Sequence, residues 1–303
     1  MSISPRLLPF AVLLCALLWG SAFPGIKAIY ATWAEDGIEP SFSNRLILAG
    51  VRYTLAGLIL LLLARQPLKE WKQTPKGRLL WFACSQTFFQ YMTFYTALSI
   101  SSAALGGLLT GTGSLWWVIL APLILKTTWP SRYQWSLIGL GTVGVLIAVY
   151  RPGGGSGDPV LGGILFILST LSGALAVIAL QGIIPTMGPR AASGFGLLIG
   201  GLMLSVAGFA AWSTFADLFT PTVILWTVYL AFVSAIAFDI WNYLTTIFPV
   251  NLLAGYRFLI PICAVVESAL FVKGESLGIG ILLGGVLVIT SIIGLQRTQK
   301  KRM

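Results

Sequence analysis

The sequence contains no histidine, only three cysteines and only 9% charged residues, and each shortage excludes a class of site. Without histidine, the commonest metal ligand and the side chain that titrates near neutrality are both missing, so any pH-dependent step has to use carboxylates. Cys15, Cys84 and Cys263 all fall within apolar runs, which indicates packing residues and not a disulfide framework or a metal site. We therefore expect no metal and no cofactor.

In place of charged residues the sequence is rich in apolar residues, which make up 57% of the 303 positions. Such a composition does not describe a soluble domain. The net charge of +10 comes from lysines and arginines in short stretches between apolar runs, so nucleic acid is not expected as a partner. The chain is predicted to be an all-α polytopic membrane protein, surrounded by membrane lipids.

Ten apolar segments follow one another, each near the roughly 20 residues that are needed to cross about 30 Å of hydrocarbon. They are predicted at 7–29, 46–64, 79–98, 103–125, 134–150, 160–181, 191–212, 223–246, 252–272 and 277–295. The first is longer than the apolar part of a typical signal peptide, so we expect an uncleaved helix. Lysine and arginine collect in the loops that share a side with both termini, which predicts cytoplasmic termini and an inner (cytoplasmic) membrane location.

The two halves of the chain resemble each other. Tyr95-Thr96-Ala97-Leu98 aligns with Tyr243-Leu244-Thr245-Thr246, and 104–126 aligns with 252–273. Because each half holds an odd number of spans, the second half enters the membrane from the opposite side. We predict two inverted five-helix repeats, 1–152 and 159–303, joined by a Gly-rich linker at 153–158 that lacks the Lys-Ser/Thr ending of a phosphate-binding loop. Inverted repeats are typical of transporters, whose substrate site lies near the bilayer midplane.

Four short motifs carry a family resemblance. They are Trp19-Gly20-Ser21-Ala22-Phe23-Pro24, Arg52-Tyr53, Tyr95-Thr96-Ala97-Leu98 and Lys273-Gly274-Glu275. With the five-plus-five arrangement, the whole chain resembles the EamA-type carriers of the drug/metabolite transporter superfamily. The resemblance implies a ten-helix carrier, often an exporter of amino acids or other small metabolites, with a cavity lined mainly by helices 1, 3, 4, 6, 8 and 9. The chain departs from the family pattern at Gly113-Ser114 and Lys126-Thr127-Thr128, so the substrate stays open.

Polar and aromatic side chains form stripes on several spans. Asp239, Asn242, Tyr243 and Thr246 follow the i, i+3, i+4, i+7 spacing of one helix face. Facing stripes and the first-span motif give the predicted cavity residues: Trp19, Ser21, Gln90, Tyr91, Tyr95, Thr110, Ser114, Trp117, Asp239, Asn242, Tyr243 and Arg257. The alternative for the tyrosines and tryptophans is the aromatic belt at the membrane surface, which is favoured only for Trp71, Trp129, Trp135 and Trp212 near segment ends.

Four charged residues lie deep in predicted spans, where an ionised side chain costs at least about 2.5–3.5 kcal/mol and normally faces a partner or a water-filled cavity. At about 1.5 Å per residue, Asp239 and Arg257 share one depth, and Arg52 and Glu267 share another. We predict these two charge pairs. Each is either a structural ion pair or part of a gate or ligand site. Asp239 is the carboxylate that could exchange a proton, which makes protons the candidate coupling ion.

A carrier that works by alternating access explains the repeat, the polar stripes and the absence of catalytic residues together. A channel or lipid scramblase, which would transport without saturation, and a drug or organic-cation exporter of the same fold are the alternatives. An enzyme is not expected, because the sequence offers no paired nucleophile and base at one depth. Few arginines are available for a phosphorylated solute, so a zwitterionic or weakly polar small molecule is favoured. The direction of transport and the oligomeric state stay open, a monomer included.

Overall fold

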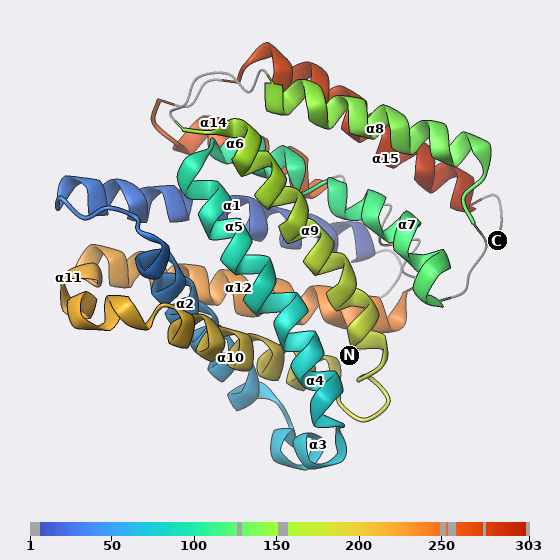
Figure 1. Ribbon diagram of the computed structural model, residues 1–303. Helices are drawn as coiled ribbons and strands as arrows, with labels where there is room; N and C mark the ends of the chain where they lie inside the picture. Colours follow the sequence, from blue (N-terminus) through green and yellow to red (C-terminus); the bar gives the residue numbers. More distant parts are fainter. Residues whose placement is uncertain are drawn as a thin grey trace.

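The computed structural model describes residues 7–125, 129–150, 157–248, 253, 259–274 and 277–300. In these ranges the chain is helical and forms no strand (Figure 1). Six helices have the length and apolar composition to cross a membrane: α1 (Leu8–Glu35), α2 (Phe42–Leu63), α8 (Arg132–Tyr150), α9 (Pro159–Gln181), α10 (Pro189–Ala207) and α12 (Pro221–Ile247). Shorter apolar helices follow in α14 (Leu259–Phe271) and α15 (Ile279–Lys300). The prediction of an all-α membrane protein is confirmed.

The third and fourth predicted spans are interrupted helices. The third consists of α4 (Lys76–Ala83), a π-helical turn η2 (Cys84–Phe88) and α5 (Phe89–Ile100), which follow without a gap. The fourth consists of α6 (Ala103–Leu109) and α7 (Thr112–Leu125), which are separated at Thr110 and Gly111. π-Turns are frequent at functional sites, and broken helices are tolerated at membrane depth where they line a cavity. Both interruptions are therefore candidate positions for a functional site.

Local sequence explains where several helices begin. A proline stands in the first turn of α9, α10 and α12, where its missing N–H costs no hydrogen bond. Asp158 caps α9, because its Oδ1 accepts hydrogen bonds from the backbone N–H groups of Val160 and Leu161, both at 3.0 Å. Three short elements complete the described chain: α3 (Pro67–Gln73), η3 (Phe209–Thr214) and α11 (Phe215–Leu218).

The helices of the two halves pair in a two-fold pattern. α2 packs against α10, and α8 packs against α15, so each contacts its counterpart in the other half (Figure 1). α1 contacts α12 and α14, and its counterpart α9 contacts α5 together with α6 and α7. Exchanging the halves converts one set of contacts into the other. This is the packing expected of two related five-helix units.

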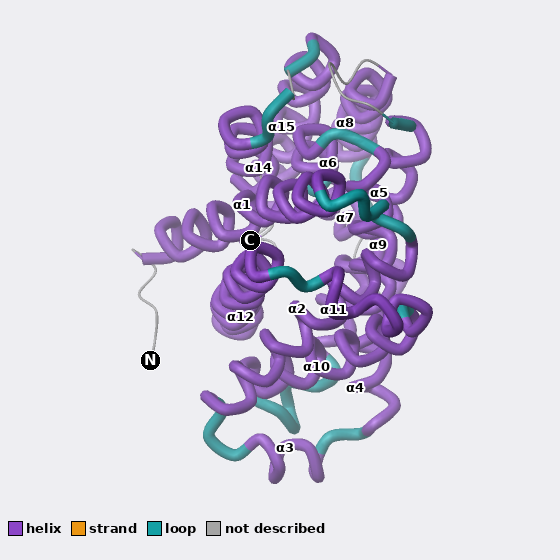
Figure 2. The backbone as a smooth tube through the Cα atoms, turned by 90° about the vertical axis from the view of Figure 1, so that its left-hand side faces the viewer, coloured by secondary structure: helices purple, strands orange, loops and turns teal. Residues whose placement is uncertain are grey.

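Glycines allow the counterpart helices to approach closely. A Cβ added to Gly144 of α8 would lie 2.7 Å from the carbonyl oxygen of Gly284 in α15. Gly57 of α2 has the same role against α10, where an added Cβ would lie 2.7 Å from the carbonyl oxygen of Gly194. Lipid supplies no hydrophobic drive for helix association, so such close backbone contact holds the pairs together. Figure 2 shows the α8–α15 pair and α3 at opposite ends of the molecule.

Candidate binding cavity

A cavity of about 120 Å³ lies where helices from both halves meet. Its aromatic lining consists of Trp19, Phe23, Phe82, Tyr91, Phe94, Phe166, Phe238 and Trp241. Its polar lining consists of Arg52, Gln86, Gln90, Thr110, Ser169, Thr170 and Asn242. These residues come from α1, α2, α4, η2, α5, α9 and α12 and from the break after α6, and Ile260 of α14 completes the wall. The site is amphipathic, as ligand pockets usually are.

Five of the predicted cavity residues line this cavity: Trp19, Gln90, Tyr91, Thr110 and Asn242. Arg52, which was predicted as a gating residue, lines it as well. Gln86 lies in the π-helical turn and Thr110 at the break of the fourth span, so both interruptions face the cavity. Contact of these side chains with a solute stays a prediction.

Other predicted residues lie outside the lining. The hydroxyl of Ser21 donates to the carbonyl of Leu18 and accepts from Tyr229, at 2.9 and 2.7 Å. Tyr95 is fully buried, and its hydroxyl accepts a hydrogen bond from Arg52. Ser114 is buried, and within the described part of the chain its hydroxyl has no hydrogen-bond partner. Arg257 and the side chain of Trp117 lie outside the described residues.

Helix geometry explains two of these differences. The prediction of both Thr110 and Ser114 as cavity residues assumed one continuous helix, whereas the chain breaks at Gly111. On α12 the cavity face is Phe238, Trp241 and Asn242, so Asp239 and Tyr243 are outside the cavity lining. The lining residues of α12 are also spaced i, i+3, i+4. The prediction chose its helix face from polar residues, whereas the face that lines the cavity is mainly aromatic.

Arg52 is held at the cavity by neutral partners. Its side chain is buried, with 2% of the residue exposed. Nε donates to Ser234 Oγ at 2.9 Å and to the Leu230 carbonyl at 3.2 Å, and Nη1 donates to the Tyr95 hydroxyl at 2.9 Å. The guanidinium carbon lies 4.8 Å from the centre of the Tyr53 ring, a cation–π distance. These contacts orient the guanidinium, but none of them neutralises its charge.

The predicted pair between Arg52 and Glu267 is wrong. Arg52 faces α12, whereas Glu267 of α14 faces α1, where a Cβ on Gly20 would lie 2.7 Å from its Oε1. Glu267 Oε1 is buried and has no hydrogen-bond partner among the described residues. The prediction rested on depth along the membrane normal alone, and two helices can present charges of the same depth to different neighbours.

Asn242, part of the polar lining, joins three helical elements. Its Nδ2 donates to Gln86 Oε1 at 3.0 Å and to Ser193 Oγ at 2.8 Å, which links α12 to η2 and α10. Ser193 Oγ in turn donates to the Pro189 carbonyl at 2.8 Å. A side-chain amide has two N–H donors, so the contacts leave the carbonyl oxygen of Asn242 as its remaining polar group. Binding of a solute by this oxygen stays a prediction.

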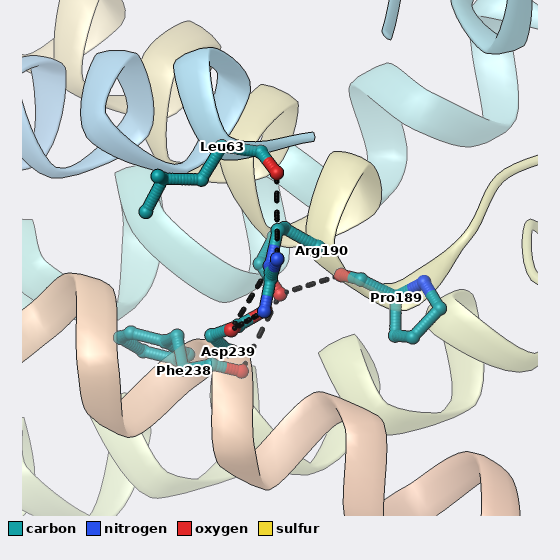
Figure 3. Close-up of polar contacts among 6 residues, drawn as sticks. Leu63, Pro189, Arg190, Phe238 and Asp239 are labelled. Atoms are coloured by element: carbon teal, nitrogen blue, oxygen red, sulfur yellow. Dashed lines mark hydrogen bonds and ion pairs between the residues drawn. The ribbon is translucent and has the colours of Figure 1, made fainter. Parts of the chain in front are cut away.

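Asp239 pairs with Arg190, as Figure 3 shows. Arg190 Nε lies 3.0 and 3.1 Å from the two carboxylate oxygens of Asp239, and Nη2 lies 2.8 Å from Oδ2. Nη1 donates to the carbonyl of Leu63 at 3.3 Å. We call this group of Arg190, Asp239 and the Leu63 carbonyl the clasp, because it joins the ends of α2 and α10 to α12. The predicted partner of Asp239, Arg257, lies outside the described residues.

The resemblance implied that the sixth span, α9, lines the cavity, but none of its residues was among the predicted cavity residues. Ser169, Thr170 and Gly173 line the cavity, and Ser169 Oγ donates to the Gln90 carbonyl at 2.9 Å. A Cβ on Gly173 would lie 3.0 Å from Gln90 Oε1, so the glycine makes room for that amide. The i, i+1, i+4 spacing of these small residues on one side of a helix was the available signal.

Comparison with known proteins identifies the family. A family model described as "EamA-like transporter family" matches residues 7–150 and again residues 160–296. The chain belongs to the EamA-like transporter family. The double match is the two-repeat pattern of this family and agrees with the pairing of counterpart helices. The resemblance seen in the sequence motifs is thereby confirmed at the level of the family.

Similarity to solved structures concerns the fold of this EamA-like protein. A solved protein described only as "Crystal structure of protein" shares 15% sequence identity, with 98% of this chain and 99% of that chain covered and a TM-score of 0.58. It is one of 17 chains of solved structures that match. No curated protein matches the chain. At such low identity the likeness shows the architecture and nothing about the solute.

Proposed function

We propose that this EamA-like protein is a secondary transporter that exports small organic solutes across the cytoplasmic membrane by alternating access. The observation that carries the proposal is the cavity, which is built by helices of both halves and combines an aromatic wall with amides, hydroxyls and one guanidinium. Amino acids and related zwitterionic or amphipathic solutes have the matching chemistry, because an apolar side chain packs on aromatic rings while the charged end meets polar groups.

The proposal includes ten membrane crossings with both termini cytoplasmic. Six long apolar helices, α14, α15 and the interrupted stretches 76–100 and 103–125 supply the spans. Cysteine labelling tests the orientation in a background without the native cysteines. A cysteine replacing Lys72 should react with a membrane-impermeant maleimide only from the cytoplasmic side, and one replacing Glu35 only from outside. The reverse pattern would invert the topology.

Uptake into proteoliposomes tests the transport function. Purified protein should take up labelled amino acids with saturation and should show counterflow, since alternating access passes each solute through one bound state. Nucleosides and cationic dyes serve as comparison solutes, and a proton gradient across the membrane tests coupling to protons. Linear uptake without counterflow would favour a channel, and lipid flipping without solute uptake would favour a scramblase.

The organic-cation exporter is the less favoured alternative within the same fold. A cationic solute needs carboxylates or an otherwise electronegative site, whereas the charged residue that lines the cavity in the described part of the chain is Arg52. Saturable transport of the cationic dyes with no transport of amino acids would reverse this preference.

A further inference from the structure

We propose that Arg52 is the anchor for a carboxylate of the transported solute. This inference rests on the proposed function only in taking the cavity as the solute site. Among the cavity-lining residues that the structure describes, Arg52 is the one charged side chain. Its hydrogen bonds in the described chain go to a backbone carbonyl and two hydroxyls, and no carboxylate is among these partners.

A buried guanidinium without a counter-ion is costly, because its desolvation is not repaid by a nearby negative charge. In most proteins a carboxylate of the same chain supplies that charge. Here Glu267 faces another helix, and Asp239 is occupied by Arg190. An anionic solute that enters the cavity would supply the missing charge, so binding would be favoured at this position.

The guanidinium is already oriented for such a contact. Nε and Nη1 are fixed by Ser234 and Tyr95, and the face of the group rests on the Tyr53 ring. The hydrogen bonds of Arg52 within the described chain use Nε and Nη1, so Nη2 and the charge remain available to a ligand. Orientation before binding lowers the entropy that binding has to overcome. Ser234 belongs to the second half and Arg52 to the first, so the anchor joins the two halves of the molecule.

One guanidinium suits a carboxylate better than a phosphate. A carboxylate carries one charge and matches the fork of an arginine, whereas a phosphate dianion normally gathers several cationic donors. The carbonyl oxygen of Asn242 adds an acceptor in the same cavity, which suits an ammonium group. The chemistry therefore fits a carboxylate-bearing solute, with amino acids as the zwitterionic case.

A matched series of phenyl compounds tests the anchor by direct binding. Phenylalanine, 3-phenylpropionate, 2-phenylethylamine and phenyl phosphate share the ring and differ in charged groups. Each competes with tritiated phenylalanine for the full-length protein in lipid nanodiscs, and uptake is measured separately in proteoliposomes. We expect phenylalanine and 3-phenylpropionate to bind, and 2-phenylethylamine and phenyl phosphate to bind at least about tenfold more weakly, since a charge-assisted hydrogen bond is lost or mismatched.

Variants locate the effect at one residue. Arg52→Gln should weaken phenylalanine binding about tenfold or more, and Arg52→Lys should retain part of the affinity because the charge remains. Arg45→Gln is the matched control, since Arg45 lies on the same helix, is half-buried and binds Ser99 outside the cavity lining. Tyr95→Phe removes a support of the guanidinium and leaves its charge, so its effect should be smaller than that of Arg52→Gln.

The wild-type series decides the question even if Arg52→Gln does not fold. Equal binding of 2-phenylethylamine and 3-phenylpropionate, or absence of binding by both carboxylates, would overturn the anchor. An unchanged affinity in folded Arg52→Gln would overturn it as well. Carboxylate-selective binding without uptake would instead support the anchor and contradict the transporter, so the two proposals fail separately.

Discussion

The clasp between Arg190, Asp239 and the Leu63 carbonyl offers the sharpest test of how the cavity opens. Arg190→Gln removes three close contacts to the Asp239 carboxylate and the bond to the end of α2. A carrier has to part the helices around its cavity on one side at a time. Because the clasp ties α2 and α10 to α12 at one end, its loss should favour the state that is open at that end.

The size of the effect follows from exposure. The side chains of Arg190 and Asp239 are 50% and 21% exposed, so the pair is partly screened by water. Exposed ion pairs contribute about 0.2–1 kcal/mol, and side-chain pairs inside membrane proteins average about 0.6 kcal/mol with a maximum near 1.7 kcal/mol. Because Nε and Nη2 of Arg190 both contact the Asp239 carboxylate, we place the contribution of this pair near the upper end of the range for exposed pairs, at about 1 kcal/mol. That free energy corresponds to a population shift of about fivefold.

Accessibility of the cavity measures the shift. Val177 of α9 lines the cavity, so Val177→Cys in a background without native cysteines reports opening by its rate of reaction with an impermeant maleimide. We expect Arg190→Gln and Asp239→Asn each to raise the rate from the clasp side about fivefold, and the difference should shrink at high salt. Arg132→Gln, at the exposed start of α8, should leave the rate unchanged.

The charge-swapped double variant Arg190→Glu with Asp239→Arg distinguishes a gating role of the clasp from a purely structural role. If the clasp is a gate, both single variants stay folded and label faster, and the swap restores slow labelling. If it is a structural brace, both single variants lose folded protein and the swap restores the yield. Unchanged labelling in two well-folded single variants would refute the proposed opening at this end.

Two further predictions concern the scaffold around the cavity. Asn242→Ala leaves Gln86 Oε1 without its hydrogen-bond donor, so we expect the free energy of unfolding to fall by about 1–3 kcal/mol, measured by thermal unfolding. Binding assays should show weaker binding of ammonium-bearing solutes. An unaltered melting temperature would contradict the hydrogen-bond network. Gly144→Leu should destabilise the α8–α15 pair by about 1–3 kcal/mol. Gly139→Leu on the same helix should not, because an added Cβ at Gly139 meets nothing within 4 Å. Equal melting temperatures of the two variants would contradict this packing.

Features that depend on composition and length could be predicted from the sequence. The helical membrane class, the two repeats and most helix positions follow from apolar runs of a fixed length, which can be read directly along the sequence. Trp19, Gln90, Tyr91, Thr110 and Asn242 were found because polar and aromatic residues are rare enough in these spans to be conspicuous. The interruptions at Cys84–Phe88 and at Thr110 were not predicted, because hydropathy does not change where a helix widens or breaks.

Partners of the charged residues could not be predicted, because depth fixes only one coordinate. Arg52 and Glu267 share a predicted depth but face different helices, and the rotation of each helix about its axis is set by packing. The predicted spans 160–181 and 191–212 leave Arg190 in the loop between them. Pro189 in fact begins α10 there, which places Arg190 one turn before Ser193 and within reach of Asp239.

The polar contacts around the cavity share an architecture that bears on mechanism. α12 of the second half contacts α2 of the first through Ser234 and Arg52, and η2 of the first through Asn242 and Gln86. Asp239 lies one turn before Asn242 and connects the same helix to α10. A shift of α12 would therefore alter the clasp, the amide network and the support of the guanidinium together. We expect occupancy of Arg52 by a carboxylate to influence the clasp through α12, which is one continuous helix and therefore the physical connection that coupling between two sites requires.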